Sequence, residues 1–368
     1  MQLAVYCGWL LNGPLGGLLA GGFFIFPAFI LLSGLGWLYQ AYGALPLVQG
    51  FFVGIRPVVV ALVILSTIRL SRKNLKTPLL TGIALFSFLG LSVVGMSYPA
   101  VLIATVLLGA LVGSRWRHLL IPRHPGAPEA HASSPSPALS LTSFCGTLLV
   151  GIASWLTPIL LSRSWLGPSN ILEQLGVFFT QSALLVFGGA YSLIPYVSDA
   201  MVNVHGWLTP GEIIDSLALG ETTPGPLLMV FTFMGYLTGS KSPDLMPLSS
   251  PWPGLLGSAF VTWYTFLPSF VLVLCGAPLA ERLHGKNIFA NILAAISAAV
   301  VGVILSLAVY LAKSVFAHAP KTVEGLGGML MIGLLALLML GRWRWPTPVA
   351  LMVGGILGTG MTLLKMGL

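Results

Sequence analysis

Long apolar segments recur along the whole chain, and they constrain the fold more than any other feature. A helix needs about 20 residues to cross the ~30 Å hydrocarbon core of a bilayer. About eleven segments approach that length, and they cover residues 16–38, 46–69, 77–95, 97–114, 141–162, 172–197, 213–238, 254–278, 288–314, 325–341 and 346–365. Only 7% of the residues are charged, against about 25% in a typical soluble domain. The sequence therefore predicts an all-α polytopic membrane protein.

One stretch differs from the rest in composition. Residues 115–140 are rich in Pro, Ser, His and Arg, which is typical of a linker. We expect a cytoplasmic linker here, with residues 1–114 and 141–368 forming the two parts of the protein.

The basic residues predict the orientation, because short cytoplasmic loops are enriched in Lys and Arg. Alternating helices place the larger group on one side, which comprises Arg69, Arg72, Lys73, Lys76, Arg115, Arg117, Arg123, Arg282, Lys286, Arg342 and Arg344. The smaller group falls on the other side and comprises Arg163, Lys241, Lys313, Lys321 and Lys365. The first side is predicted to be cytoplasmic. This distribution, together with contact with anionic lipids, accounts for the net charge of +8 without nucleic acid.

The two parts resemble each other. Residues 26–29 (FPAF) and 58–61 align with residues 267–270 (LPSF) and 299–302 at one offset of 241 positions. Apolar strings can match by chance, but a shared proline and a constant offset favour duplication. The predicted helices between the two copies are odd in number, so the copies face opposite ways, as in many secondary transporters. We therefore expect two inverted-topology repeats.

Within this repeat, residues 8–10 match residues 235–237 at a smaller offset. Met1 then aligns near Leu228, and residues 172–228 have no counterpart in the first copy. The first repeat is therefore expected to lack its amino-terminal part.

Glycine and proline interrupt two of the later apolar segments. Gly188, Gly189 and Pro195 lie in the first, and Pro224–Gly225–Pro226 lies in the second. Irregular backbone at membrane depth survives only inside protein or beside a water-filled cavity. A helix that restarts after such a break presents N–H groups that can bind an anion. We predict that these residues shape a substrate path, although a loop at the membrane surface is the plainer alternative.

Acidic residues precede the second interruption. Glu212 follows Thr209-Pro210-Gly211, the pattern of a helix start, and we interpret Glu212 and Asp215 as helix-start acids. Glu221 lies next to the break. An acid inside a membrane is a functional candidate by default, so Glu221 is our candidate for proton coupling, with helix capping as the alternative.

Arg56 lies beside Pro57, well inside an apolar segment. Its side chain could extend to the interface. Alternatively, it supplies a fixed positive charge to an anionic substrate.

The motifs of enzymes and metal proteins are missing from the sequence. There is no Walker motif, no HExxH and no nucleophile elbow, and the three cysteines are far apart. We expect no catalytic residue, no metal site and no cofactor, and hence not an enzyme. The sequence does not fix whether the chain forms a homo-oligomer.

Several motifs together resemble the chromate ion transporter family. They are Phe187–Tyr191 with Pro195, Gly220–Pro226, Gly206–Leu208, Phe266–Phe270, and Ala4–Leu10 with Phe26-Pro27. The resemblance covers nearly the whole chain, except for the family's amino-terminal Gly-Gly and Pro-Gly-Pro segment.

The resemblance implies a multi-pass secondary transporter of the plasma membrane that exports chromate and confers chromate resistance. Sulfate is the related oxyanion. A truncated or accessory membrane subunit, or a transporter of another inorganic anion, is the alternative.

Overall fold

The computed structural model describes residues 1–115, 141–186, 193–283, 287–317 and 323–366. Within these ranges every regular element is a helix. The main helices are α1 (Gln2–Tyr42), α2 (Pro46–Asn74), α3 (Pro78–Leu89), α4 (Tyr98–Arg115), α5 (Leu141–Leu166), α6 (Ile171–Leu184), α7 (Leu193–Asp199), α8 (Pro210–Thr222), α9 (Val230–Lys241), α10 (Trp252–Leu283), α11 (Asn287–Ala317), α12 (Val323–Leu337) and α13 (Thr347–Met366). Short π-helical turns η1 (Gly90–Val94), η4 (Ala200–Val204) and η7 (Leu338–Arg342) extend three of them, and 3-10 turns form η5 (Leu227–Met229) and η6 (Pro243–Leu245). The predicted linker lies almost wholly outside the described residues.

Six described helices are long and apolar enough to cross a membrane, namely α1, α2, α5, α10, α11 and α13. Three shorter apolar stretches, Pro78–Val94, Tyr98–Val112 and Leu326–Arg342, fall on other predicted spans. The structure is thus that of a polytopic all-α membrane protein, as predicted.

The two remaining predicted spans, 172–197 and 213–238, are not continuous helices. The first is divided into α6 and α7, and the second into α8 and α9. At about 1.5 Å per residue, none of these four pieces reaches the ~30 Å needed to cross a bilayer alone. In the second span the interruption falls at Pro224-Gly225-Pro226, where the sequence predicts a helix break because Pro and Gly prevent helix continuation.

Helix α1 begins with a hairpin. Asn12 and Gly13 leave helical geometry, and Gly13 has a positive φ of 59°. The first arm folds back so closely that a Cβ on Gly8 would lie 2.4 Å from the carbonyl oxygen of Gly16. The part of α1 before Asn12 is therefore a helical arm that packs on the rest of α1.

The pair α9 and α10 repeats this close approach. A Cβ on Gly257 would lie 2.1 Å from the carbonyl oxygen of Gly235. In the sequence alignment Gly8 corresponds to Gly235, and Gly16 corresponds to Gly257 at the 241-residue offset. Equivalent residues thus make equivalent contacts, which supports our proposal of two related repeats.

The proposed repeats pack against each other. Helix α2 packs along α12 and α13, whereas α11, its proposed counterpart, packs along α3 and α4. Glycine allows close contacts in both places, since Gly54 of α2 meets the backbone of Gly358 in α13 and Gly302 of α11 meets the carbonyl oxygen of Ala84 in α3.

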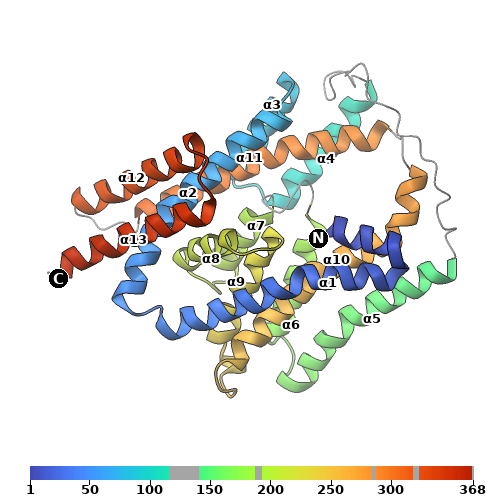
Figure 1. Ribbon diagram of the computed structural model, residues 1–368. Coiled ribbons are helices and arrows are strands. Elements are labelled where there is room, and N and C mark those ends of the chain that lie inside the picture. The colour runs from blue at the N-terminus through green and yellow to red at the C-terminus, as the bar shows by residue number, and fades with distance from the viewer. Residues whose placement is uncertain (116–140, 187–192, 284–286, 318–322, 367–368) are drawn as a thin grey trace.

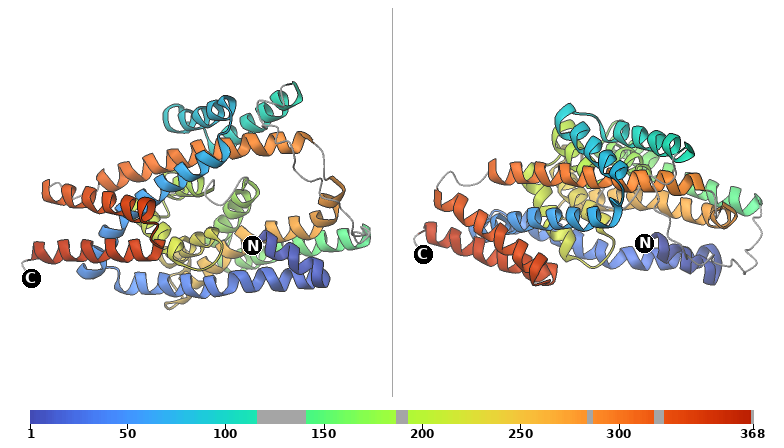
Figure 2. Two further views of the ribbon diagram at one scale, coloured as in Figure 1. Left: turned by 45° about the horizontal axis from the view of Figure 1, so that its top comes forward. Right: turned by 90° about the horizontal axis from the view of Figure 1, so that it is seen from above.

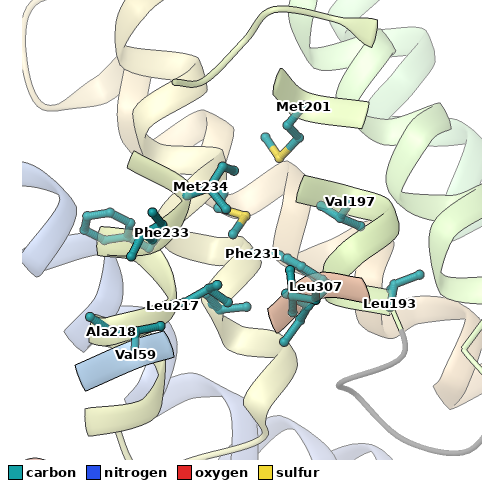
Figure 3. Packing of buried hydrophobic residues seen from close by; sticks show 14 of the residues in the cluster. Val59, Leu193, Val197, Met201, Leu217, Ala218, Phe231, Phe233, Met234 and Leu307 are labelled. Carbon is teal, nitrogen blue, oxygen red and sulfur yellow. The ribbon is translucent and has the colours of Figure 1, made fainter. Parts of the chain in front are cut away.

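The short helices lie in the centre of the molecule. Figure 1 shows α7, α8 and α9 framed by the long helices α1, α2, α10 and α11, and the turned views in Figure 2 show α1 and α11 running along opposite sides of them. The core is formed where these elements meet: Val59, Leu217, Phe231 and Leu307 come from four different helices and are buried together (Figure 3). The broken segments are therefore enclosed by protein.

Candidate functional site

Helix α8 starts with a complete capping box. The Thr209 side chain accepts a hydrogen bond from the Glu212 backbone N–H, and the Glu212 carboxylate accepts from the Thr209 N–H at 2.9 Å. Pro210 occupies the first turn, where its missing donor costs nothing. Glu212 also forms an ion pair with Lys241 at the end of α9. The prediction that Glu212 is a helix-start acid is confirmed.

Helix α8 ends just before Pro224-Gly225-Pro226. Gly225 has φ of 133°, and a Cβ there would lie 2.9 Å from the Cβ of Ala28 in α1. The chain then restarts as η5 and α9, with Pro226 at the N-cap of η5. Pro224 and Gly225 are exposed, whereas the backbone from Met229 onward is buried. The loop is therefore seated against α1, at the mouth rather than the centre of the helix bundle.

A buried ion pair joins α8 to α2. Arg56 donates from Nε to Oδ1 of Asp215 at 3.0 Å and from Nη2 to Oδ2 at 3.1 Å. The Tyr39 hydroxyl of α1 donates to Oδ2 at 2.9 Å. The Asp215 side chain is 1% exposed and the Arg56 side chain 24%. Such a two-pronged pair has the strongest geometry available to a guanidinium and a carboxylate.

This pairing changes the interpretation of both residues. Asp215 does not cap α8, and its interpretation as a helix-start acid was wrong: it lies one turn beyond Glu212 and points to Arg56. Arg56 does not extend to the interface unpaired. With both groups ionised their charges cancel, so Arg56 can attract an anion only if Asp215 is protonated or moves.

Glu221 lines a polar cavity of about 720 Å³. Three arginines, Arg69, Arg72 and Arg344, share its wall. They come from α2 and from the segment after η7, and all belong to the basic group predicted to be cytoplasmic. Pro224–Pro226 are not among the lining residues. The sequence placed Glu221 beside the helix break but gave no sign of its arginine neighbours.

A second pocket, of about 470 Å³, lies at the other end of α8. Its wall includes Thr209, Lys241 and Asp244, and Lys241 belongs to the smaller basic group. Arg56 and Asp215 lie between the two hollows, since Asp215 is about 9 Å along the helix axis from Glu221. The buried ion pair on α8 thus lies between this pocket and the arginine-lined cavity.

Of the other predicted path residues, the structure describes Pro195. Pro195 is in α7, partly buried, next to the aromatic cluster of Phe178 and Tyr196. Gly188 and Gly189 fall outside the described residues. In the loop before α8, His205 stacks on Trp207 with ring centres 4.1 Å apart, and burial lowers the pKa of His205 below its ordinary value. His205 is therefore neutral near pH 7 and serves as an aromatic packing group.

Comparison with known proteins agrees with this architecture. The family model described as chromate transporter matches residues 1–113 and 173–359. The chromate transport protein of Cupriavidus metallidurans is 27% identical over 325 residues, which is 88% of this chain and 72% of that protein. The probable chromate transport protein of Synechococcus elongatus is 27% identical over 361 residues, or 97% of this chain and 80% of that protein.

A third relative, the chromate transport protein of Pseudomonas aeruginosa, is 28% identical over 335 residues, 88% of this chain and 70% of that protein. No solved structure matches the chain significantly.

Proposed function

This chain belongs to the chromate transporter family, and from that premise we propose that it is a secondary active transporter that exports chromate across the plasma membrane. Export from the cytoplasm would confer chromate resistance. Sulfate is the second substrate we propose, because both ions are tetrahedral dianions with similar hydrogen-bond geometry. Self-association into a homo-oligomer stays a prediction.

One observation carries the proposal: Asp215 of α8, the helix before the Pro-Gly-Pro break, holds Arg56 of α2 in a buried ion pair between two hollows. Charged residues inside a membrane protein are costly and mark ion pathways or proton relays. Discontinuous helices near the midplane are where many secondary transporters bind their substrates. A purely structural membrane subunit needs neither feature.

We assign the roles along this path as follows. Arg56 binds the anion once Asp215 releases it, and Glu221 takes up the coupling proton at the arginine-lined cavity. The break at Pro224-Gly225-Pro226 lets α8 and α9 move separately. Gly188, Gly189 and Pro195 stay predicted residues of the substrate path.

Transport is tested with the purified protein in liposomes. Vesicles loaded with unlabelled sulfate and diluted into labelled sulfate or chromate should accumulate label by exchange, while empty liposomes should not. The double variant Arg56→Gln/Asp215→Asn removes both charges of the pair and so leaves no unpaired charge. It should lose exchange. The control Arg163→Gln removes a charge from an exposed pair with Glu173 and should exchange normally.

Equal exchange by the double variant would reject the path through α8. Absence of exchange by the wild-type protein with either ion would reject the proposed substrates and favour an accessory role. Direction is tested separately in inverted membrane vesicles, where export appears as uptake.

A further inference from the structure

We propose that the arginine-lined cavity is a binding site for a free tetrahedral dianion, at which the substrate is collected before it reaches Arg56. The identity of the ion and the side of the membrane rest on the proposed function. The existence of the site rests on the cavity and its charges.

The cavity concentrates cationic donors of the right kind. Arg69 and Arg72 lie one turn apart on α2, and Arg344 faces them from the segment between η7 and α13. Each guanidinium presents five N–H donors in a planar fork that matches oxyanion geometry. The hydroxyls of Ser66 and Thr347 complete the polar lining. A volume of about 720 Å³ accommodates an oxyanion with part of its water shell.

The side chain of Arg69 and the backbone of Arg344 are held in position. Nη2 of Arg69 donates to the carbonyl oxygen of Leu340 at 3.2 Å, which connects α2 to the π-helical turn η7 and leaves the other N–H groups of the fork for a ligand. Arg344 has a positive φ of 55°. A non-glycine residue in this conformation is uncommon and is maintained only where the surroundings require it. One guanidinium of the site is thus oriented by the protein before a ligand arrives.

The charge balance selects a dianion. Arg69, Arg72 and Arg344 with Glu221 give the cavity a net charge of about +2 when all four groups are ionised. A free sulfate or chromate ion neutralises that charge. The phosphodiester of a lipid headgroup carries a single negative charge and would leave the cavity positive, so we assign the site to the soluble ion.

Glu221 makes the site sensitive to protons. The charged groups that line the cavity with it are Arg69, Arg72 and Arg344. A proton on Glu221 removes the only negative charge among the described lining residues and strengthens anion binding. Replacement of Glu221 by Gln should therefore tighten binding and reduce its dependence on pH.

The test is equilibrium binding of radiolabelled sulfate to the purified full chain in neutral detergent, followed by scintillation proximity. At a separation of about 6 Å in a water-like dielectric, removing one arginine charge weakens binding of a dianion roughly five- to tenfold. We expect this for Arg72→Gln and for Arg344→Gln. The chain offers matched controls in Lys73→Gln and Arg342→Gln, which remove the same charge from the same segments but do not line the cavity. Each control should change Kd less than twofold.

Three results would overturn the site: no binding of sulfate by the wild-type protein, equal losses in the cavity and control variants, or no loss in any of them. Displacement of sulfate by short-chain phosphatidylglycerol, dependent on Arg72 and Arg344, would assign the cavity to a lipid headgroup instead. All variants must elute as single species with unchanged thermal midpoints. Sulfate binding without transport would support the site and reject the proposed function. Normal transport with unchanged binding in the cavity variants would support the proposed function and reject the site.

Discussion

The pair between Arg56 and Asp215 should reveal itself as a strong energetic coupling. We expect Arg56→Gln to destabilise the protein more than Asp215→Asn, although both remove the same contact. The reason is the difference in exposure: Asp215 is 1% exposed, whereas Arg56 is 24% exposed and retains access to water. The carboxylate left behind has only the Tyr39 hydroxyl as a described hydrogen-bond donor besides Arg56.

The magnitudes follow from these contacts. Removing one partner of a buried pair costs about 3–5 kcal/mol, which we expect for Arg56→Gln. Asp215→Asn loses charge-assisted hydrogen bonds of about 1.5–3 kcal/mol but leaves a partly hydrated guanidinium. The double variant leaves no uncompensated charge, so it should be at least as stable as Arg56→Gln alone. The coupling energy should then be about 1.5–3 kcal/mol, at the upper end of the range for contacting residues.

The free energy of unfolding can be measured by titration with sodium dodecyl sulfate in mixed micelles, with tryptophan fluorescence as the signal. Arg163→Gln serves as control, because its pair with Glu173 spans 3.5 Å and its side chain is 56% exposed; exposed pairs contribute less than about 1 kcal/mol. The reasoning would be refuted if the stability losses of the two single variants added up to the loss of the double variant. A larger loss of stability for Asp215→Asn than for Arg56→Gln would refute it as well.

Three further predictions concern the break, the helix packing and the coupling. Gly225→Ala should cost about 1–3 kcal/mol, because of the positive φ and the contact with Ala28, and should lower exchange in liposomes; normal stability and exchange would argue against a precise seat for the loop. Gly358→Ala should lower the unfolding free energy by about 1–3 kcal/mol, because a Cβ there would lie 2.4 Å from Gly54 Cα. Gly360→Ala is the control, because there is open space around Gly360. Equal losses of stability in the two variants would contradict the packing. Glu221→Gln should reduce the pH dependence of sulfate exchange, and an unchanged pH profile would remove Glu221 from the coupling.

The membrane class and most helices follow from the sequence because twenty-residue apolar segments have few other solutions. The helix breaks were also visible, since Pro224-Gly225-Pro226 cannot continue a helix. Their consequence was only partly anticipated: the sequence placed the break in a substrate path, yet the structure seats it against Ala28 of α1. The depth of a loop depends on packing between distant segments, which local chemistry does not encode.

The charged site illustrates the same limit. The sequence singled out Arg56 and Glu221 but missed Asp215 as the partner of Arg56, because 159 positions separate them. One signal was available: Asp215 and Arg56 are oppositely charged and both lie in predicted spans, where unpaired charges are costly. The cavity around Glu221 is assembled from α2, α8, η7 and the segment between η7 and α13, so its arginines looked like ordinary loop charges that set orientation.

The most direct test of the central claim, that α8 connects two hollows that open on opposite sides of the membrane, is thiol accessibility. In a chain whose Cys7, Cys145 and Cys275 are replaced by Ser, single cysteines are placed at Ser66 in the arginine-lined cavity and at Gln174 in the opposite pocket. A membrane-impermeant thiol reagent should label Ser66→Cys only in inverted vesicles and Gln174→Cys only in right-side-out vesicles, and sulfate should protect Ser66→Cys. Labelling of both positions from one side, or none at Ser66→Cys from either side, would contradict the account.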